Sequence, residues 1–187
     1  ESLESRRSLS AQPSPAIPHR IEHVQMLRPE DAARLRSINV ALCVTPANMV
    51  LDMNLIDLAL GNNGKWTYPF RLLMDTGAPV MFSSDCPVCD PDPLLGIHAA
   101  VTRQRADNTP EKGWYPGSRV TVAEALKAYT WTPAAIHNAG YIGTIAPGKQ
   151  ADMVVLSRNI LAIPPSTLKD VHVDMTLFDG RIVHRHY

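Results

Sequence analysis

The chain has 187 residues, of which 45% are hydrophobic, and this suffices for one domain or for one large and one small unit. Its 18 basic and 18 acidic residues give zero formal net charge, so no overall field favours nucleic acid or an anionic membrane. No apolar run approaches the roughly 18 residues that a membrane span needs. Three cysteines without framework spacing argue against a disulfide-built secreted module, so we expect a reducing, cytoplasmic location.

The first residues suggest that other sequence precedes this chain. There is no initiator Met, and residues 1–7 are too charged for a signal peptide and are typical of the last turns of a helix. Residues 8–18 are rich in Ser and Pro, which favours a loop, either ordered or a disordered linker.

Residues 19–84 alternate between predicted strands and helices. Because strand–helix alternation implies parallel pairing, the competing folds are an open doubly wound sheet and a (β/α)8 barrel. No glycine-rich phosphate loop follows a strand, and this favours the TIM barrel. The chain would supply about the last three strand–helix units of that barrel. The predicted strands are 19–24, 40–45 and 80–84, and the predicted helices are 29–36, 51–60 and 68–76.

The second half of the chain changes from helices to strands. Helices are predicted at 92–104 and at 121–130, the latter starting with a Thr121 and Glu124 capping box. Alternating apolar residues then predict strands, and Asp179-Gly180 predicts a hairpin turn between the last two. We therefore expect residues 1–142 to form part of the barrel and 143–187 a small β-sheet unit. The predicted strands are 153–156, 171–177 and 181–183.

Two residues stand where a parallel barrel carries its chemistry, at the carboxyl ends of strands. His23 lies near the end of the first predicted strand and Asp85 directly follows the third. Imidazole and carboxylate groups suit a zinc-type cation, and a carboxylate can also take a proton from water. A lone histidine at a strand end more often only satisfies a hydrogen bond, so both interpretations stay open at this point.

Several short motifs, in order, resemble the amidohydrolase superfamily, in the amidohydrolase-3 branch that includes N-substituted formamide deformylase. The resemblance covers almost the whole chain and corresponds to the final third of such an enzyme. The matching segments are 20–25 (RIEHVQ), 84–88 (SDCPV), 92–94 (DPL), 100–103 (AVTR), Trp114, 124–126 (EAL), 129–130 (YT) and 143–156.

The resemblance implies a metal-dependent hydrolase of a non-peptide amide or related C–N bond. His23 would be a ligand on the sixth barrel strand, and Asp85, on the eighth, would be both ligand and general base. Arg103 and Trp114 would lie near the substrate. The cofactor would be a divalent metal, most simply one or two zinc ions. The last 45 positions, 143–187, would belong to the composite β-sandwich of such enzymes.

The resemblance also implies that the remaining ligands, including a His-x-His pair, precede Glu1. A catalytic zinc normally has three protein ligands, so this chain alone would be inactive and would need the rest of the same protein as its partner. Another expected partner is a small amide-type substrate, and further copies of the chain stay an open alternative. Neither nucleic acid nor a membrane is expected as a partner. Residues 44–48 depart from the family pattern, so the substrate is not carried over.

Two other functions compete with the hydrolase. One is a non-catalytic barrel fragment that serves in assembly, which loss of the upstream ligands would favour. The other is a thiol oxidoreductase that uses the Cys86 and Cys89 pair, although Cys43 looks like a core residue. Five other histidines are expected to serve packing or the surface: His98, His137, His172, His184 and His186.

Overall fold

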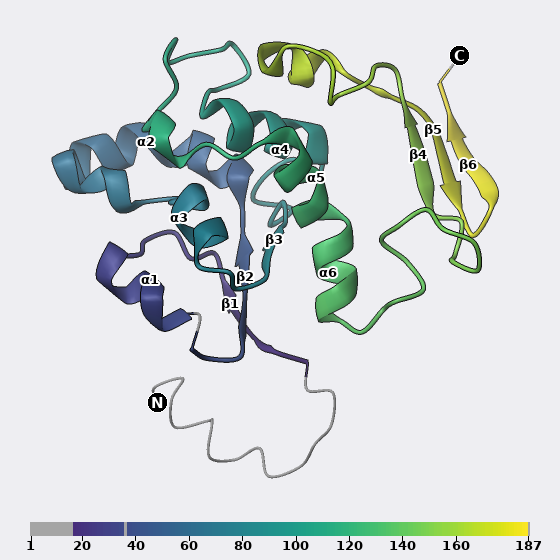
Figure 1. Cartoon of the computed structure of the whole chain (residues 1–187). Coiled ribbons are helices and arrows are strands. Elements are labelled where there is room, and N and C mark those ends of the chain that lie inside the picture. Colours follow the sequence, from purple (N-terminus) through teal and green to yellow (C-terminus); the bar gives the residue numbers. More distant parts are fainter. Residues whose placement is uncertain (1–16, 36, 187) are drawn as a thin grey trace.

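A computed structural model describes residues 17–35 and 37–186. These residues form two separate β-sheets, with helices around the first (Figure 1). The predicted helix end at 1–7 and most of the loop at 8–18 lie outside the described residues. Within the described ranges, no helix combines the length and the apolar character needed to cross a membrane. The chain is thus of the α/β class, with one parallel and one antiparallel sheet.

The first sheet is parallel and has the order β1-β2-β3, so sequence neighbours are also neighbours in space. Its strands are β1 (His19–Glu22), β2 (Val40–Val44) and β3 (Val80–Phe82). Every residue of β2 is buried, as its nearly all-apolar sequence predicted for a strand covered on both faces. All three strands were predicted correctly, although each is shorter at its carboxyl end than expected. The two polar candidates therefore lie in loops that follow β1 and β3.

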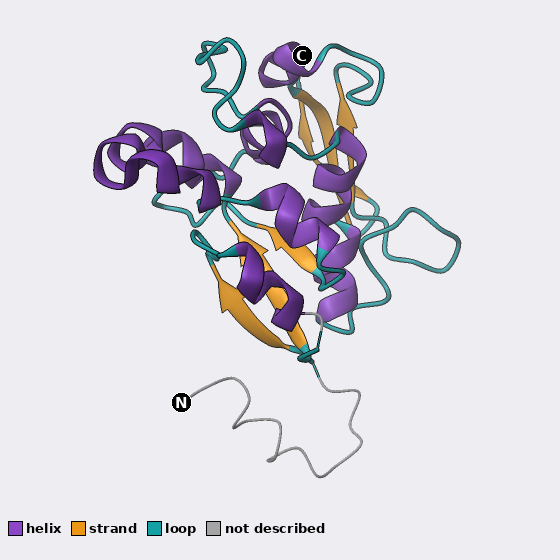
Figure 2. Cartoon of the chain, turned by 60° about the vertical axis from the view of Figure 1, so that its left-hand side comes forward, coloured by secondary structure: helices purple, strands orange, loops and turns teal. Residues whose placement is uncertain are grey.

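Helices cross between the strands and pack on the sheet (Figure 2). The second helix begins at Pro46, earlier than the predicted residue 51, because proline fits the first turn of a helix, where its missing N–H is not needed. A 3-10 helix follows this helix directly, starting at Gly61. The α-helices are α1 (Pro29–Leu35), α2 (Pro46–Leu60), α3 (Phe70–Asp75), α4 (Pro93–Thr102), α5 (Val122–Tyr129) and α6 (Trp131–Ile136), and the 3-10 helices are η2 (Gly61–Trp66), η3 (Pro116–Ser118) and η4 (Pro165–Asp170).

The main core lies between the sheet and these helices. Aromatic rings connect α3, β3 and α5: the centroids of Phe70 and Phe82 are 5.7 Å apart, and those of Phe82 and Tyr129 are 5.5 Å apart. The opposite face of the sheet carries a smaller buried cluster, to which α6 contributes. β2 and β3 are thereby buried on both faces, whereas three of the four residues of β1 are exposed. The smaller cluster consists of Ala41, Cys43, Met81 and Ile136.

The second sheet is antiparallel with the order β4-β5-β6, and it lies to one side of the helices in Figure 1. Its strands are β4 (Met153–Leu156), β5 (Val173–Phe178) and β6 (Arg181–Arg185), so this part of the prediction is correct within two residues. Asp179 and Gly180 both have positive φ, as the predicted two-residue hairpin turn requires. The 3-10 helix η4 contacts α4, which connects this unit to the helical part.

Candidate active site

His23 directly follows β1 and has a left-handed backbone, with φ of 68°, and Val24 follows with φ of 41°. The next residue anchors this turn: the Tyr68 backbone N–H donates to the Gln25 carbonyl (2.7 Å), and Gln25 Nε2 donates to the Tyr68 hydroxyl (2.6 Å). That hydroxyl in turn donates to Asp52 Oδ2 on α2 (2.5 Å). Positive φ is costly for a β-branched residue such as Val24, so these contacts hold the segment in a conformation it would not adopt alone.

Asp85 lies in the loop after β3, also with positive φ (57°), and its carbonyl accepts from the Val88 N–H (2.8 Å). Parallel strands bring their carboxyl ends to one edge of the sheet, and the structure places the two predicted residues together there. His23 Nε2 and Asp85 Oδ2 are 4.0 Å apart, with 43% and 33% of their side chains exposed. The pair is therefore close together and open to solvent on one side.

A third residue at this edge was missed by the sequence analysis. Asn48, in the first turn of α2, is 6% exposed, and its Nδ2 donates to Asp85 Oδ2 (3.2 Å). Its Oδ1 accepts a hydrogen bond from Cys89 Sγ (2.7 Å). The sequence signal that could have found it is Pro46, because a helix that starts at this proline brings Asn48 close to the end of β2.

The geometry of His23 and Asp85 fits a shared divalent cation. Zinc bonds to imidazole nitrogen and carboxylate oxygen are about 2.1 Å long, so two ligand atoms on one ion lie at most about 4.2 Å apart, and about 3.4 Å apart at the tetrahedral angle. The observed 4.0 Å lies within this span. No group of three or more histidine, cysteine or acidic side chains suited to a metal occurs among residues 17–35 and 37–186. The described part of the chain thus offers two ligands.

Arg103 is a buried residue, with 0% exposure, at the C-terminus of α4. Its Nε donates to the Trp114 carbonyl (3.0 Å), and its Nη1 donates to the Tyr68 carbonyl (2.7 Å). Its Cζ lies 5.0 Å from the ring centroid of Phe70 and 5.2 Å from that of Trp114. Burial, and secondly the charge of Arg119, lower the pKa of Arg103 to about 9. These contacts tie three segments together inside the core.

Trp114 is 7% exposed, and its Nε1 donates to Asp57 Oδ1 on α2 (2.9 Å). The hydrogen bonds and ring contacts described for Trp114 and Arg103 do not include His23 or Asp85. Substrate contact by these two residues therefore stays a prediction.

The thiols do not have the surroundings of a redox pair. Cys86 is exposed and Cys89 is buried, and both are free. Burial raises the pKa of Cys43 to about 11, and burial also raises the pKa of Cys89. Reactive thiols have a lowered pKa, so this argues against the oxidoreductase alternative.

The other histidines lie where the sequence suggested, in packing or at the surface. His98 is 2% exposed in α4 and hydrogen-bonds Asn108 (3.2 Å). His137 follows the last residue of α6. Of the five histidines predicted to serve packing or the surface, the exposed ones are His137, His172, His184 and His186.

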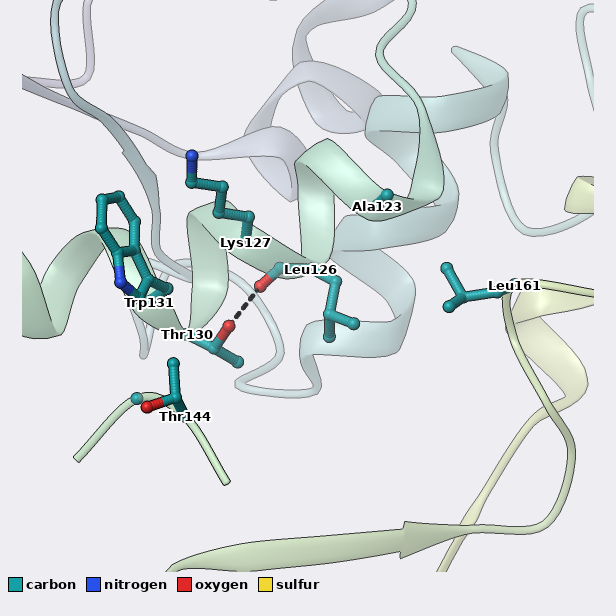
Figure 3. A pocket seen from close by; sticks show the side chains of 8 residues that line it. Ala123, Leu126, Lys127, Thr130, Trp131, Thr144 and Leu161 are labelled. Atoms are coloured by element: carbon teal, nitrogen blue, oxygen red, sulfur yellow. Dashed lines mark hydrogen bonds between the residues drawn. The ribbon is translucent and has the colours of Figure 1, made fainter. Parts of the chain in front are cut away.

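A cavity of about 430 Å³ lies between α5, α6 and the segment that leads to the second sheet (Figure 3). Leu126, Trp131 and Leu161 supply apolar walls, and Lys127 Nζ lies 4.5 Å from the Trp131 ring centroid. No histidine, cysteine or carboxylate is among the lining residues. This cavity therefore lacks the chemistry found beside His23.

Comparison with known proteins identifies the family. Residues 5–184 match the model of the Amidohydrolase family, and the chain belongs to this family. It is 34% identical over 143 residues to the protein LONG AFTER FAR-RED 3 of Arabidopsis thaliana, and 31% identical over 167 residues to the putative amidohydrolase YtcJ of Bacillus subtilis. It is also 27% identical over 164 residues to N-substituted formamide deformylase of Arthrobacter pascens. The predicted branch of the superfamily is confirmed.

These matches cover 75%, 88% and 86% of this chain but only 24%, 32% and 30% of the respective relatives. Among solved structures, an uncharacterized metal-dependent hydrolase from Pyrococcus horikoshii has a TM-score of 0.69 and 30% identity, over 79% of this chain and 30% of that one. A zinc complex of atrazine chlorohydrolase from Arthrobacter aurescens has a TM-score of 0.60 at 18% identity, over 89% and 36% of the two chains. The second likeness shows a shared fold alone.

Proposed function

We propose that this chain is part of a metal-dependent hydrolase that acts on a non-peptide amide or a related C–N bond. The observation that carries the proposal is the 4.0 Å approach of His23 Nε2 to Asp85 Oδ2 at one edge of the parallel sheet. Membership of the Amidohydrolase family supports the hydrolase class, and the relative named N-substituted formamide deformylase supports a C–N bond as its target.

We further propose that β1 to β3 are three consecutive strands of a (β/α)8 barrel that residues 1–142 help to build, with 143–187 as a small β-sheet unit. The parallel order β1-β2-β3 with helical crossovers supports this, because such a barrel places successive strands side by side. Three strands cannot close a barrel, so the other strands and ligands would come from the rest of the same protein.

In the proposed reaction, His23 and Asp85 would hold a divalent cation, most simply zinc. When bound, such a cation lowers the pKa of a coordinated water to near 7 and polarises a carbonyl. Asp85 accepts a proton from the water that attacks the carbonyl carbon, so that a C–O bond forms. It then delivers the proton to the leaving nitrogen as the C–N bond breaks, which balances the reaction. Asp85 stands a third exposed, so water can reach its carboxylate.

The test uses the full-length protein and its Asp85→Ala variant, with metal content by elemental analysis and hydrolysis of a panel of small amides. Bound zinc-like metal and activity that both fall in the variant would support the proposal. A matched control is Asp174→Ala, because His172 Nε2 and Asp174 Oδ1 form another exposed His–Asp pair, 3.2 Å apart, on the second sheet. A parent protein without metal or activity would refute the proposal and favour the non-catalytic barrel.

Several expectations stay predictions alongside this proposal. They are the cytoplasmic location, the small-molecule substrate, the homo-oligomer and substrate contact by Arg103 and Trp114. The burial of Arg103 weighs against a direct part for its guanidinium.

A further inference from the structure

Asn48 contacts the candidate base from the side of α2. Its Nδ2 donates to Oδ2 of Asp85, the same oxygen that lies 4.0 Å from His23 Nε2. Asn48 is only 6% exposed and lies in the first turn of α2, a 15-residue helix. Asp85 lies in a loop, and a third of its side chain is exposed. A buried donor on a helix thus meets a partly exposed carboxylate in a loop.

The orientation of the Asn48 amide is itself fixed. An asparagine amide can be turned over, which would exchange its oxygen and nitrogen. Here the Cys89 thiol donates to Oδ1 at 2.7 Å, and Asp85 accepts from the other end. If the amide were reversed, its N–H would face the thiol and its oxygen would face a carboxylate oxygen, which is repulsive. The carboxylate, which can only accept, therefore selects this orientation, and the thiol donates to the amide oxygen that is turned towards it.

The hydrogen bonds from Cys89 to Asn48 and from Asn48 to Asp85 have apolar surroundings at the Cys89 end. Cys89 is 9% exposed, and with Ala47 and Val50 it lines a mostly apolar cavity of about 250 Å³ between α2 and α4. Hydrogen bonds are electrostatically stronger in such low-dielectric surroundings than in water. The Asn48 amide is thereby held between an apolar interior and the carboxylate.

We propose that Asn48 is a positioning residue for Asp85, and that the Cys89 thiol supports the Asn48 amide by donating to its oxygen. The inference rests on the proposed hydrolase function and adds residues to its machinery. Asn48 holds the carboxylate at the edge of the sheet beside His23, ready to receive a cation and to exchange a proton with water. Partners of this kind orient a ligand without touching the metal.

The decisive variant is Asn48→Leu, which keeps the approximate shape of the side chain but removes both the donor and the acceptor. In the full-length protein we expect kcat to fall about 10- to 100-fold, with KM little changed because substrate binding is not removed. We also expect the dissociation constant for zinc, measured by competition with a chelator, to rise by about the same factor. The zinc measurement does not depend on turnover, and a loss of packing alone would not separate kcat from KM.

Two control sets make the result specific. Asn54→Leu makes the same exchange at an exposed position of the same helix, where Asn54 Oδ1 accepts from Arg105 Nη2 (2.7 Å), and it should leave both readouts unchanged. Cys89→Ser keeps a donor for Oδ1 and should stay near parental values. Cys89→Ala removes the donor and should show a smaller fall than Asn48→Leu.

An Asn48→Leu protein with parental kcat and parental zinc affinity would overturn the inference while leaving the hydrolase intact. If Asn48→Leu does not fold, equal kcat and zinc affinity in the Cys89→Ala and Cys89→Ser proteins would overturn it. A parent that binds no zinc and hydrolyses no amide refutes the proposed function instead. In that case crystal structures of the parent and of Asn48→Leu still test whether Asn48 positions Asp85. If the Asp85 carboxylate keeps its place in the variant, Asn48 is not a positioning residue.

Discussion

Replacing Arg103 by methionine removes a buried cation that connects three segments of the core. Its guanidinium donates to the carbonyls of Trp114 and Tyr68 and lies between two aromatic rings. Methionine is close in length and fills part of the space, but it donates nothing. The two carbonyls would then lose their charged donor in a region from which water is excluded.

The cost follows from those two bonds. A buried carbonyl left without its donor costs about 1–3 kcal/mol, so two of them cost about 2–6 kcal/mol. Removing the guanidinium also relieves the penalty of burying its charge, which is the cause of its lowered pKa. We therefore expect the free energy of unfolding to fall by about 2–4 kcal/mol. The free energy of unfolding of Arg103→Lys should lie between those of the parent and of Arg103→Met, because an ammonium can reach one carbonyl but cannot donate to both in fork geometry.

The assay is chemical denaturation of the full-length protein and both variants, with KM for the best amide measured on the same samples. A loss of less than about 0.5 kcal/mol in Arg103→Met, within the range of ordinary surface substitutions, would refute the reasoning. A rise in KM at unchanged stability would instead assign Arg103 to the substrate.

Three further predictions concern titrating groups. Burial of the Glu124 carboxyl group acts to raise its pKa, but hydrogen bonds from the helix cap and from Arg71 outweigh burial and hold the pKa of Glu124 below its ordinary value of 4.5. The contribution of Glu124 to stability is therefore present above pH 4.5 and is lost as the pH falls further. Glu124→Gln should lower the free energy of unfolding by about 1 kcal/mol at pH 7 and flatten this acid dependence, which denaturation between pH 7 and pH 3 checks. Burial lowers the pKa of His98 below 6.5, so stability should fall as the pH drops through and below 6.5, and less so in His98→Gln. At pH 8 an aromatic disulfide reagent should label exposed Cys86 rapidly and Cys43 only on unfolding, because a thiol with a pKa of about 11 is ionised in about one molecule in a thousand.

Local sequence chemistry accounts for much of the fold. The all-apolar run at 40–44 predicted a strand covered on both faces, and Asp179-Gly180 predicted the hairpin turn. The capping box of Thr121 and Glu124 is present with both of its hydrogen bonds. These features depend on neighbours in the chain, so a single sequence is enough to find them.

Element ends were harder to place. The strand predicted to run into His23 ends at Glu22, because the chain turns there into two left-handed residues that contacts with Tyr68 sustain. The helix at 131–136 was not predicted, since Pro133 normally interrupts a helix and is tolerated here only in the first turn. Both cases depend on partners distant in sequence or on exact position within a turn.

The sequence by itself determined the class of this protein: the strand–helix alternation, the family motifs, and the two candidates His23 and Asp85 at strand ends. Only the tertiary structure decided which side chains meet. It brought His23 to 4.0 Å from Asp85, added Asn48 through α2, and enclosed Arg103 within the core. The physical reason is that strand and helix propensities act over a few residues, whereas a site and a buried charge are made by segments that approach one another only when the sheet and its helices pack.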